Sequence, residues 1–160
     1  MRDAFGGTFL MYMILIFVTI YVTFLAAALK YVQAYRVKNE IINYIEQYEG
    51  FNENVKTKLE GANGEGGYLQ GISYNEKSAI TNIQHINNIP TKEGEKYCSD
   101  YGYCVELKYC DSSDKDNKCT NQGYYKVTAY MALDFTNILS FAGPIKLGVS
   151  GETRFVTLEF

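Results

Sequence analysis

FLMYMILIFVTIYVTFLAAALKYVQAYRVKNEIINYIEQYE, from Phe9 to Glu49, is the stretch that decides the fold. It contains neither Pro nor Gly, and its first charged side chain is Lys30. The uncharged run begins before it, at Ala4, and as a helix it extends about 39 Å, whereas bilayer hydrocarbon is about 30 Å thick. We therefore predict one continuous helix that crosses a lipid bilayer over residues 9–29.

A cleaved signal peptide is the alternative interpretation of this apolar run. Its charged leader would be weak, since Arg2 stands beside Asp3. The apolar run also exceeds the roughly 7–15 residues of a signal-peptide core. The sequence thus favours a retained anchor, with residues 1–8 as a short leader or cytoplasmic N-terminus.

The second half of the stretch, residues 30–50, has an amphipathic pattern. Apolar and aromatic side chains recur there three or four residues apart, at Val37, Ile41, Ile42, Tyr44, Ile45 and Tyr48. This is the spacing of one face of a helix. Gly50 is a typical helix stop. We predict that this half continues the helix and packs on a domain made by residues 51–160.

The rest of the chain indicates a small sheet with little added helix. A short helix is predicted between Asn52, as its cap, and Gly61, as its stop, followed by a flexible glycine-rich loop to Gly71. Residues 72–96 are ambiguous, and 82–86 fit either a strand or a helical turn. The predicted fold class is therefore α+β, with a long N-terminal transmembrane and amphipathic helix packed on a small antiparallel sheet.

Three segments of the last third have strand patterns. Apolar and polar residues alternate over 103–110 and again over 124–133, which predicts an antiparallel pair. A final strand is predicted over 145–160, where Gly151 suggests a bulge or bend.

All four cysteines lie in one polar part of the chain: Cys98, Cys104, Cys110 and Cys119. Their gaps hold five, five and eight residues, so no pair has the tight spacing typical of structural zinc sites. Two disulfides are favoured over zinc or free thiols. Our preferred pairing is Cys98–Cys104 with Cys110–Cys119, because each closes a short, turn-rich loop.

The two signals of membrane orientation disagree. Lys30, Arg36 and Lys38 follow the apolar run, and this excess of positive charge favours a cytoplasmic domain. Disulfides require an oxidising compartment and favour an exterior one. We give the cysteines more weight and predict a single-pass protein of the cell membrane, with the N-terminus inside and the domain outside.

Several functions find no support in the sequence. The net charge is −3 and no basic stripe is present, so nucleic acid is not an expected partner. His85 is the only histidine, and no catalytic motif accompanies it. Asp111, Asp114 and Asp116 do not follow the EF-hand pattern and indicate a solvated loop. We expect no enzyme activity, cofactor, metal or small-molecule substrate.

The two ends of the chain carry a resemblance. Residues 126–156 read KVTAYMALDFTNILSFAGPIKLGVSGETRFV. This stretch resembles the C-terminal end of TadE-like pseudopilins, in which a strand leads through an apolar segment and a Gly-Pro-type turn into a closing strand. RDAFGGTFLMYMILIF, residues 2–17, is similar to the leader, glycine and apolar helix of that family. Long-helix-on-sheet architecture is also that of type IV pilin-like proteins.

This resemblance implies a minor subunit of a tight-adherence-type pilus or secretion system. Its expected partners are the bilayer, other pilin-like subunits and the pilus assembly machinery, in a role of assembly and cell adhesion. Small residues at Ala26, Ala27 and Ala28 are the predicted helix-packing patch. Gly6 and Gly7 mark the leader boundary where one exists.

One departure from the family affects processing. Pilin-like precursors typically carry Glu five residues after the cleavage glycine, and here that position is Met11 or Tyr12. No Glu precedes Glu40, so an uncleaved or minor component fits better than a major subunit. The alternative function is a stand-alone, membrane-tethered extracellular binding or sensor domain that uses tyrosine-rich strand faces.

Overall fold

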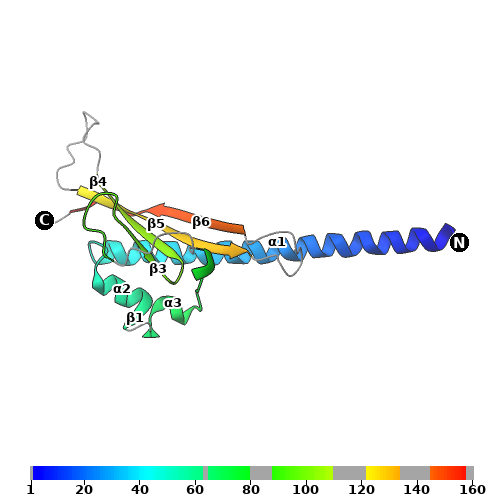
Figure 1. The fold of residues 1–160 in the computed structure, drawn as a ribbon, viewed down its shortest axis with the longest axis horizontal. Coiled ribbons are helices and arrows are strands. Elements are labelled where there is room, and N and C mark those ends of the chain that lie inside the picture. The colour runs from blue at the N-terminus through cyan, green and yellow to red at the C-terminus, as the bar shows by residue number, and fades with distance from the viewer. Residues whose placement is uncertain (1, 63–64, 80–87, 110–121, 134–144, 158–160) are drawn as a thin grey trace, which may run out of the picture.

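The computed structural model describes residues 2–62, 65–79, 88–109, 122–133 and 145–157. One helix, α1 (Arg2–Gln47), extends far beyond a head formed by the remaining elements (Figure 1). Its first half stands clear of the head and its second half lies along the sheet. The α+β architecture predicted from the sequence is confirmed, with α1 beginning before Phe9 and ending at Gln47.

The sheet of the head is antiparallel, in the order β3-β4-β5-β6. Its strands are β3 (Lys96–Ser99), β4 (Tyr103–Tyr109), β5 (Gln122–Leu133) and β6 (Ile145–Glu152). The short β7 (Val156–Thr157) pairs with the start of β5. The β4–β5 pair predicted from period-two alternation is present, with Val105 opposite Val127.

The core forms where α1 crosses the sheet. Four α1 side chains that recur three or four residues apart are fully buried: Ala34, Val37, Ile41 and Ile45. They pack in one cluster with Val127, Ala129 and Met131 of β5 and with Val105 and Leu107 of β4. This is the amphipathic face predicted from the sequence, although Ile42, Tyr44 and Tyr48 are only half-buried.

Helix α2 (Glu53–Glu60) begins and ends at the predicted residues. The Asn52 side chain accepts a hydrogen bond from the Val55 backbone N–H at 3.1 Å, and Gly61 follows the last turn. Val55 and Leu59 lie one turn apart and are buried. The helix therefore adds a second apolar stripe to the core.

The glycine-rich segment differs from the prediction of a flexible loop. It contains the small hairpin β1 (Gly61–Ala62) and β2 (Glu65–Gly66), then the single-turn helix α3 (Tyr68–Gly71). Gly67 packs on the end of α2, where a Cβ would stand 2.3 Å from the Glu60 carbonyl carbon. Close backbone packing therefore explains a glycine there, and much of the segment forms regular elements and not a loop.

Two further elements were not predicted as such. A short 3-10 helix, η1 (Lys77–Ala79), lies in the segment that the sequence left ambiguous, and strand β3 begins at the last residue of that segment, Lys96. Residues 82–86 lie outside the described residues. Gly151 is not a bulge, since it pairs in register with Val127. The final strand is instead interrupted two residues later, at Thr153. The Thr153 N–H donates to the Tyr125 carbonyl, and the Thr153 hydroxyl accepts from the Tyr125 N–H.

Candidate functional site

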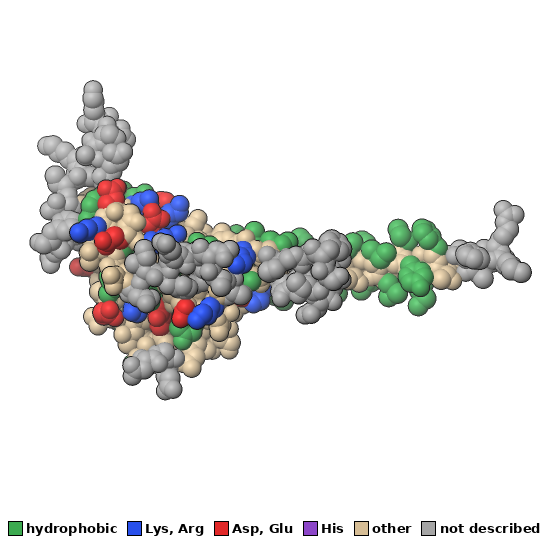
Figure 2. Space-filling view, in the orientation of Figure 1, with side chains coloured by type: hydrophobic (Ala, Val, Ile, Leu, Met, Phe, Trp, Pro, Cys, Tyr) green, Lys and Arg blue, Asp and Glu red, His purple; other side chains and the backbone are tan. Residues whose placement is uncertain are grey.

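The projecting half of α1 exposes apolar side chains on all sides. The helix is long and apolar enough to span a membrane, and no part of its most apolar window is buried. Figure 2 shows charged side chains gathered on the head, while the projecting helix shows hydrophobic ones. An exposed apolar surface of this extent needs lipid or other helices around it.

Two threonine hydroxyls of this half are satisfied within the helix. The Thr19 hydroxyl donates to the Leu15 carbonyl at 2.8 Å, and the Thr23 hydroxyl donates to the Thr19 carbonyl at the same distance. In hydrocarbon an unsatisfied hydroxyl is costly. These two threonines therefore need no polar partner from another chain in a bilayer.

The predicted packing patch lies just before the head. Ala26 and Ala28 are exposed and Ala27 is half-buried, one turn before Lys30. Small side chains let a second helix approach the backbone closely. Gly6 and Gly7, the predicted leader boundary, lie within α1, and no atom would contact a Cβ at Gly7.

A buried carboxylate joins α1 to the head directly after the apolar run. Glu76 is 5 % exposed and accepts hydrogen bonds from the Lys30 ammonium group and, at 2.9 Å, from the Ala132 backbone N–H near the end of β5. Its own N–H donates to the Tyr101 carbonyl at 2.9 Å. Glu76 therefore ties together the helix, the β3–β4 turn and β5.

Sequence reasoning missed Glu76 as a functional residue. Lys30 entered only as a flanking charge in the orientation argument, and the two residues are 46 positions apart. No local pattern links residues at that separation, so only the fold reveals the pair.

A groove of about 340 Å³ lies beside this junction. Leu29, Val32 and Ile72 give it apolar walls, and Arg36 and Gln33 complete it. The Gln33 side-chain amide donates to the Ile72 carbonyl at 3.5 Å, which holds the end of α3 against α1. The groove thus combines an apolar lining with one cationic group at the level where the helix enters the head.

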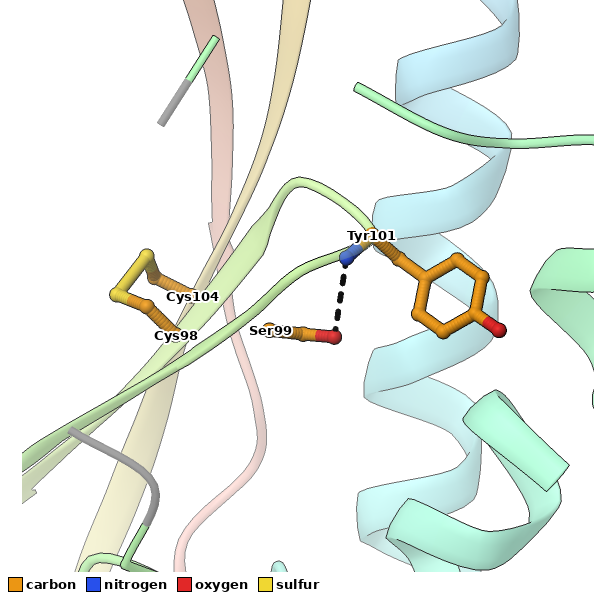
Figure 3. The surroundings of a disulfide bond; sticks show 4 residues. All are labelled: Cys98, Ser99, Tyr101 and Cys104. Atoms are coloured by element: carbon orange, nitrogen blue, oxygen red, sulfur yellow. Dashed lines mark hydrogen bonds between the residues drawn. A yellow bond between two sulfur atoms is a disulfide. The ribbon is translucent and has the colours of Figure 1, made fainter. Parts of the chain in front are cut away.

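The first of the two preferred disulfides is present in the structure (Figure 3). Cys98 on β3 and Cys104 on β4 are direct register partners, so the bond crosses one hairpin. The Ser99 hydroxyl accepts a hydrogen bond from the Tyr101 N–H at 3.2 Å within the same turn. Both cysteines are about 1 % exposed, which suits a structural bond and not thiol chemistry. Cys110 and Cys119 lie outside the described residues.

A second buried polar cluster ties α2 to the sheet. The hydroxyls of Tyr97 and Tyr103 donate to the same Glu60 carboxylate oxygen, at 2.7 and 2.6 Å. Burial, followed by the nearby Glu60 charge, raises the pKa of Tyr103 well above its usual range. Both phenols therefore stay protonated as hydrogen-bond donors, and the cluster acts as a structural tie.

The described residues offer no metal centre. Among them, no group of three or more His, Cys, Asp or Glu side chains is placed to hold a metal ion. His85, Asp111, Asp114 and Asp116 lie outside the described ranges. A second groove, of about 340 Å³, lies at the other end of the head and is lined by Glu46, Glu49, Arg154, Phe155 and Val156.

The candidate functional site is therefore the surface of α1 from its exposed apolar half to its junction with the head. In comparisons with known proteins, the chain matches no family model, no curated protein and no solved structure.

Proposed function

We propose that the chain is a minor, TadE-like membrane-anchored subunit of a tight-adherence-type pilus or secretion assembly, with no enzymatic role. One observation carries the proposal: a single unbroken helix is exposed and apolar in its first half and packed on an antiparallel sheet in its second. The resemblance of residues 2–17 and 126–156 to TadE-like sequences supports the same assignment.

The proposed mechanism is mechanical. The apolar half of α1 stores the subunit in the bilayer, and the same surface packs against helices of other pilin-like subunits. Ala26, Ala27 and Ala28 form the contact at which two helices approach most closely. The head lies outside the cell, where an oxidising environment maintains Cys98–Cys104.

Site-directed crosslinking tests this packing. With Cys introduced at Ala27, we expect crosslinked adducts with other pilin-like helices in intact cells. The matched control is Cys at Asn88, an exposed position on the head. Absence of adducts specific to Ala27→Cys would exclude assembly through this patch.

Shearing tests membership of a filament. We expect part of the protein to leave sheared cells together with filaments. The alternative, a stand-alone tethered binding or sensor domain, predicts that all of it stays in the membrane pellet. That alternative is favoured by the groove beside Glu46 and Arg154, which is open at the end of the head farthest from the anchor.

Two further measurements test processing and topology. Mass spectrometry of the mature N-terminus should find an uncleaved chain, and a new terminus after Gly6 or Gly7 would contradict this. Added protease should digest the head on intact cells. Finding the head protected and its four thiols free would place it in the cytosol.

A further inference from the structure

Strand β6 begins with exposed apolar side chains at the end of the head nearest the anchor (Figure 1). Ile145 is 48 % exposed and Leu147 is 44 % exposed. Ile145 pairs with Leu133 of β5 and Leu147 pairs with Met131. Met131 packs against α1 in the core, and Leu133, two residues later, points to the same face of the sheet. Ile145 and Leu147 therefore lie on the same side of the sheet as the helix, at its flank.

A chain of contacts fixes the level of these residues along α1. Lys30 is the first charged residue after the apolar run, and it bonds Glu76. Glu76 also accepts the N–H of Ala132, whose register partner is Lys146. Lys146 thus lies close to the level of Lys30, where the uncharged half of α1 ends.

Strand geometry gives the same level independently. A Cβ at Gly151 would stand 2.9 Å from Lys38 Cδ and 3.0 Å from Ile42 Cδ1, so Gly151 lies beside this part of α1. Ile145 is six residues earlier, about 20 Å back along a strand. That distance is about 13 residues of helix, since β6 runs along α1. Ile145 therefore lies beside the last turns of the apolar run, near Leu25 to Leu29.

Aromatic residues of α1 complete this surface. Tyr31 and Tyr35 are about half-exposed and stack, with ring centroids 6.5 Å apart. The Lys38 ammonium group lies 4.2 Å from the centre of the Tyr35 ring, and the stem of Lys38 lies beside Gly151 of β6. The tyrosines thus share the flank of α1 that faces β6.

We propose that this surface, the basal patch of Tyr31, Tyr35, Ile145 and Leu147, rests in the headgroup region of the bilayer that α1 spans. Tyrosine is enriched at that depth. Lys146 lies between the two apolar residues of β6 and points to the other face of the sheet, where a lysine can keep its charge in water. Lipid is the occupant because the patch is level with the end of the anchor. The head is then held to the membrane at two places, the helix and β6. This inference rests on the anchor and not on the pilus assignment.

Single-tryptophan fluorescence tests the proposal, because the chain contains no tryptophan. Three variants of the full chain are reconstituted into vesicles with and without lipids brominated near the headgroup end of the acyl chains. Leu147→Trp reports the basal patch, and Phe155→Trp, 57 % exposed in the groove beside Glu46 at the C-terminal end of α1, is its matched control. Phe17→Trp reports insertion of the anchor itself, measured with lipids brominated deep in the chain.

We expect bromine to quench Leu147→Trp and Phe17→Trp, and to leave Phe155→Trp unchanged. Quenching at Phe17 without quenching at Leu147 overturns the basal contact and leaves the anchor intact. Absence of quenching at Phe17 overturns both.

A blue-shifted Leu147→Trp emission that bromine does not reduce would show that protein, such as a second copy, covers the patch, and this also overturns the proposal. Ile145→Trp provides a second reporter at the same level if Leu147→Trp does not fold. Folding of each variant is checked by its thermal unfolding transition in the same vesicles.

Discussion

At the scale of single residues, two carboxylates hold the head together at its opposite ends. Glu76 bonds Lys30 and the N–H of Ala132 next to the anchor. The Glu46 carboxylate, near the C-terminal end of α1, accepts hydrogen bonds from the backbone N–H and the guanidinium group of Arg154. Each joins α1 to a distant segment, and neither follows a local pattern.

The Glu76 contacts predict a difference between two substitutions. Glu76→Ala removes the acceptor of the Ala132 N–H, and a partly buried donor without a partner costs about 1–3 kcal/mol. Glu76→Gln keeps an oxygen for that N–H and loses the acceptor for Lys30, whose ammonium group is half-exposed and can turn to water, so we expect about 1 kcal/mol or less. Denaturant unfolding of the full chain in micelles measures both. Equal costs would show that the Ala132 bond contributes nothing.

Glu46 predicts how stability depends on pH. The backbone N–H of Arg154, and then its guanidinium group, lower the pKa of Glu46 below its ordinary value of 4.5. The stabilisation is therefore present above that value and is lost as the pH falls through the lower pKa of the folded state. We expect Glu46→Gln to flatten the dependence of Tm on pH in this acidic range.

Arg154→Ala is the matched control for that measurement. It removes the guanidinium group and keeps the backbone N–H that bonds Glu46 at 2.9 Å. We therefore expect Arg154→Ala to retain more of the pH dependence than Glu46→Gln does. Identical profiles for the two variants would assign the effect to the guanidinium group alone.

At the scale of elements, the sequence predicted those with a strong local period. The apolar stripe of α1 and the alternation of β4 and β5 are regular over many residues, so each element was identifiable. Strand β3 has four residues and its burial comes from packing that its own sequence does not show. The hairpin β1–β2 has two residues in each strand, too few to give a period.

Gly102 in the β3–β4 turn and Gly151 in β6 predict opposite tolerance to a methyl group. At Gly102, φ is +99° and a Cβ would stand 2.7 Å from Glu76 Cβ and 2.9 Å from its backbone. At Gly151 the nearest atoms belong to the ends of the flexible side chains of Lys38 and Ile42. We expect Gly102→Ala to cost about 2–5 kcal/mol and Gly151→Ala less than about 1.5 kcal/mol. Thermal unfolding of the two variants compares them, and a larger loss at Gly151 would contradict this packing.

At the scale of the whole molecule, the sequence predicted the long apolar helix, the helix-on-sheet architecture and the Cys98–Cys104 bond. It did not predict the junction at Glu76, the groove beside Arg36 or the position of β6 next to the anchor. All three depend on residues that are far apart in the chain. Local periodicity carries no information about such pairs. Cys98 and Cys104, in contrast, are only six positions apart, and this short spacing indicated their pairing.

The division of α1 into two halves predicts that the head folds without the anchor. Its buried helix residues begin at Ala34, and the most apolar window of α1 is not buried at all. We expect residues 30–160, secreted under an added signal sequence, to form a folded monomer with a cooperative thermal transition. Circular dichroism and gel filtration measure this.

A longer deletion is the control. Starting the chain after Ile41 removes Ala34, Val37 and Ile41 from the core, and we expect that variant not to fold. A cooperative transition in this shorter chain would show that the helix is dispensable for the head.

The unbroken course of α1 has a consequence for geometry. Successive residues of a helix are about 100° apart around its axis. No Gly or Pro lies between Phe9 and Gln47 that would let the apolar half of α1 rotate relative to the half that packs on the sheet. The orientation of the head about the helix axis therefore determines which side of the apolar half faces a given neighbour. A rotation of the head about the axis of α1 would therefore turn the apolar end of the helix by the same angle.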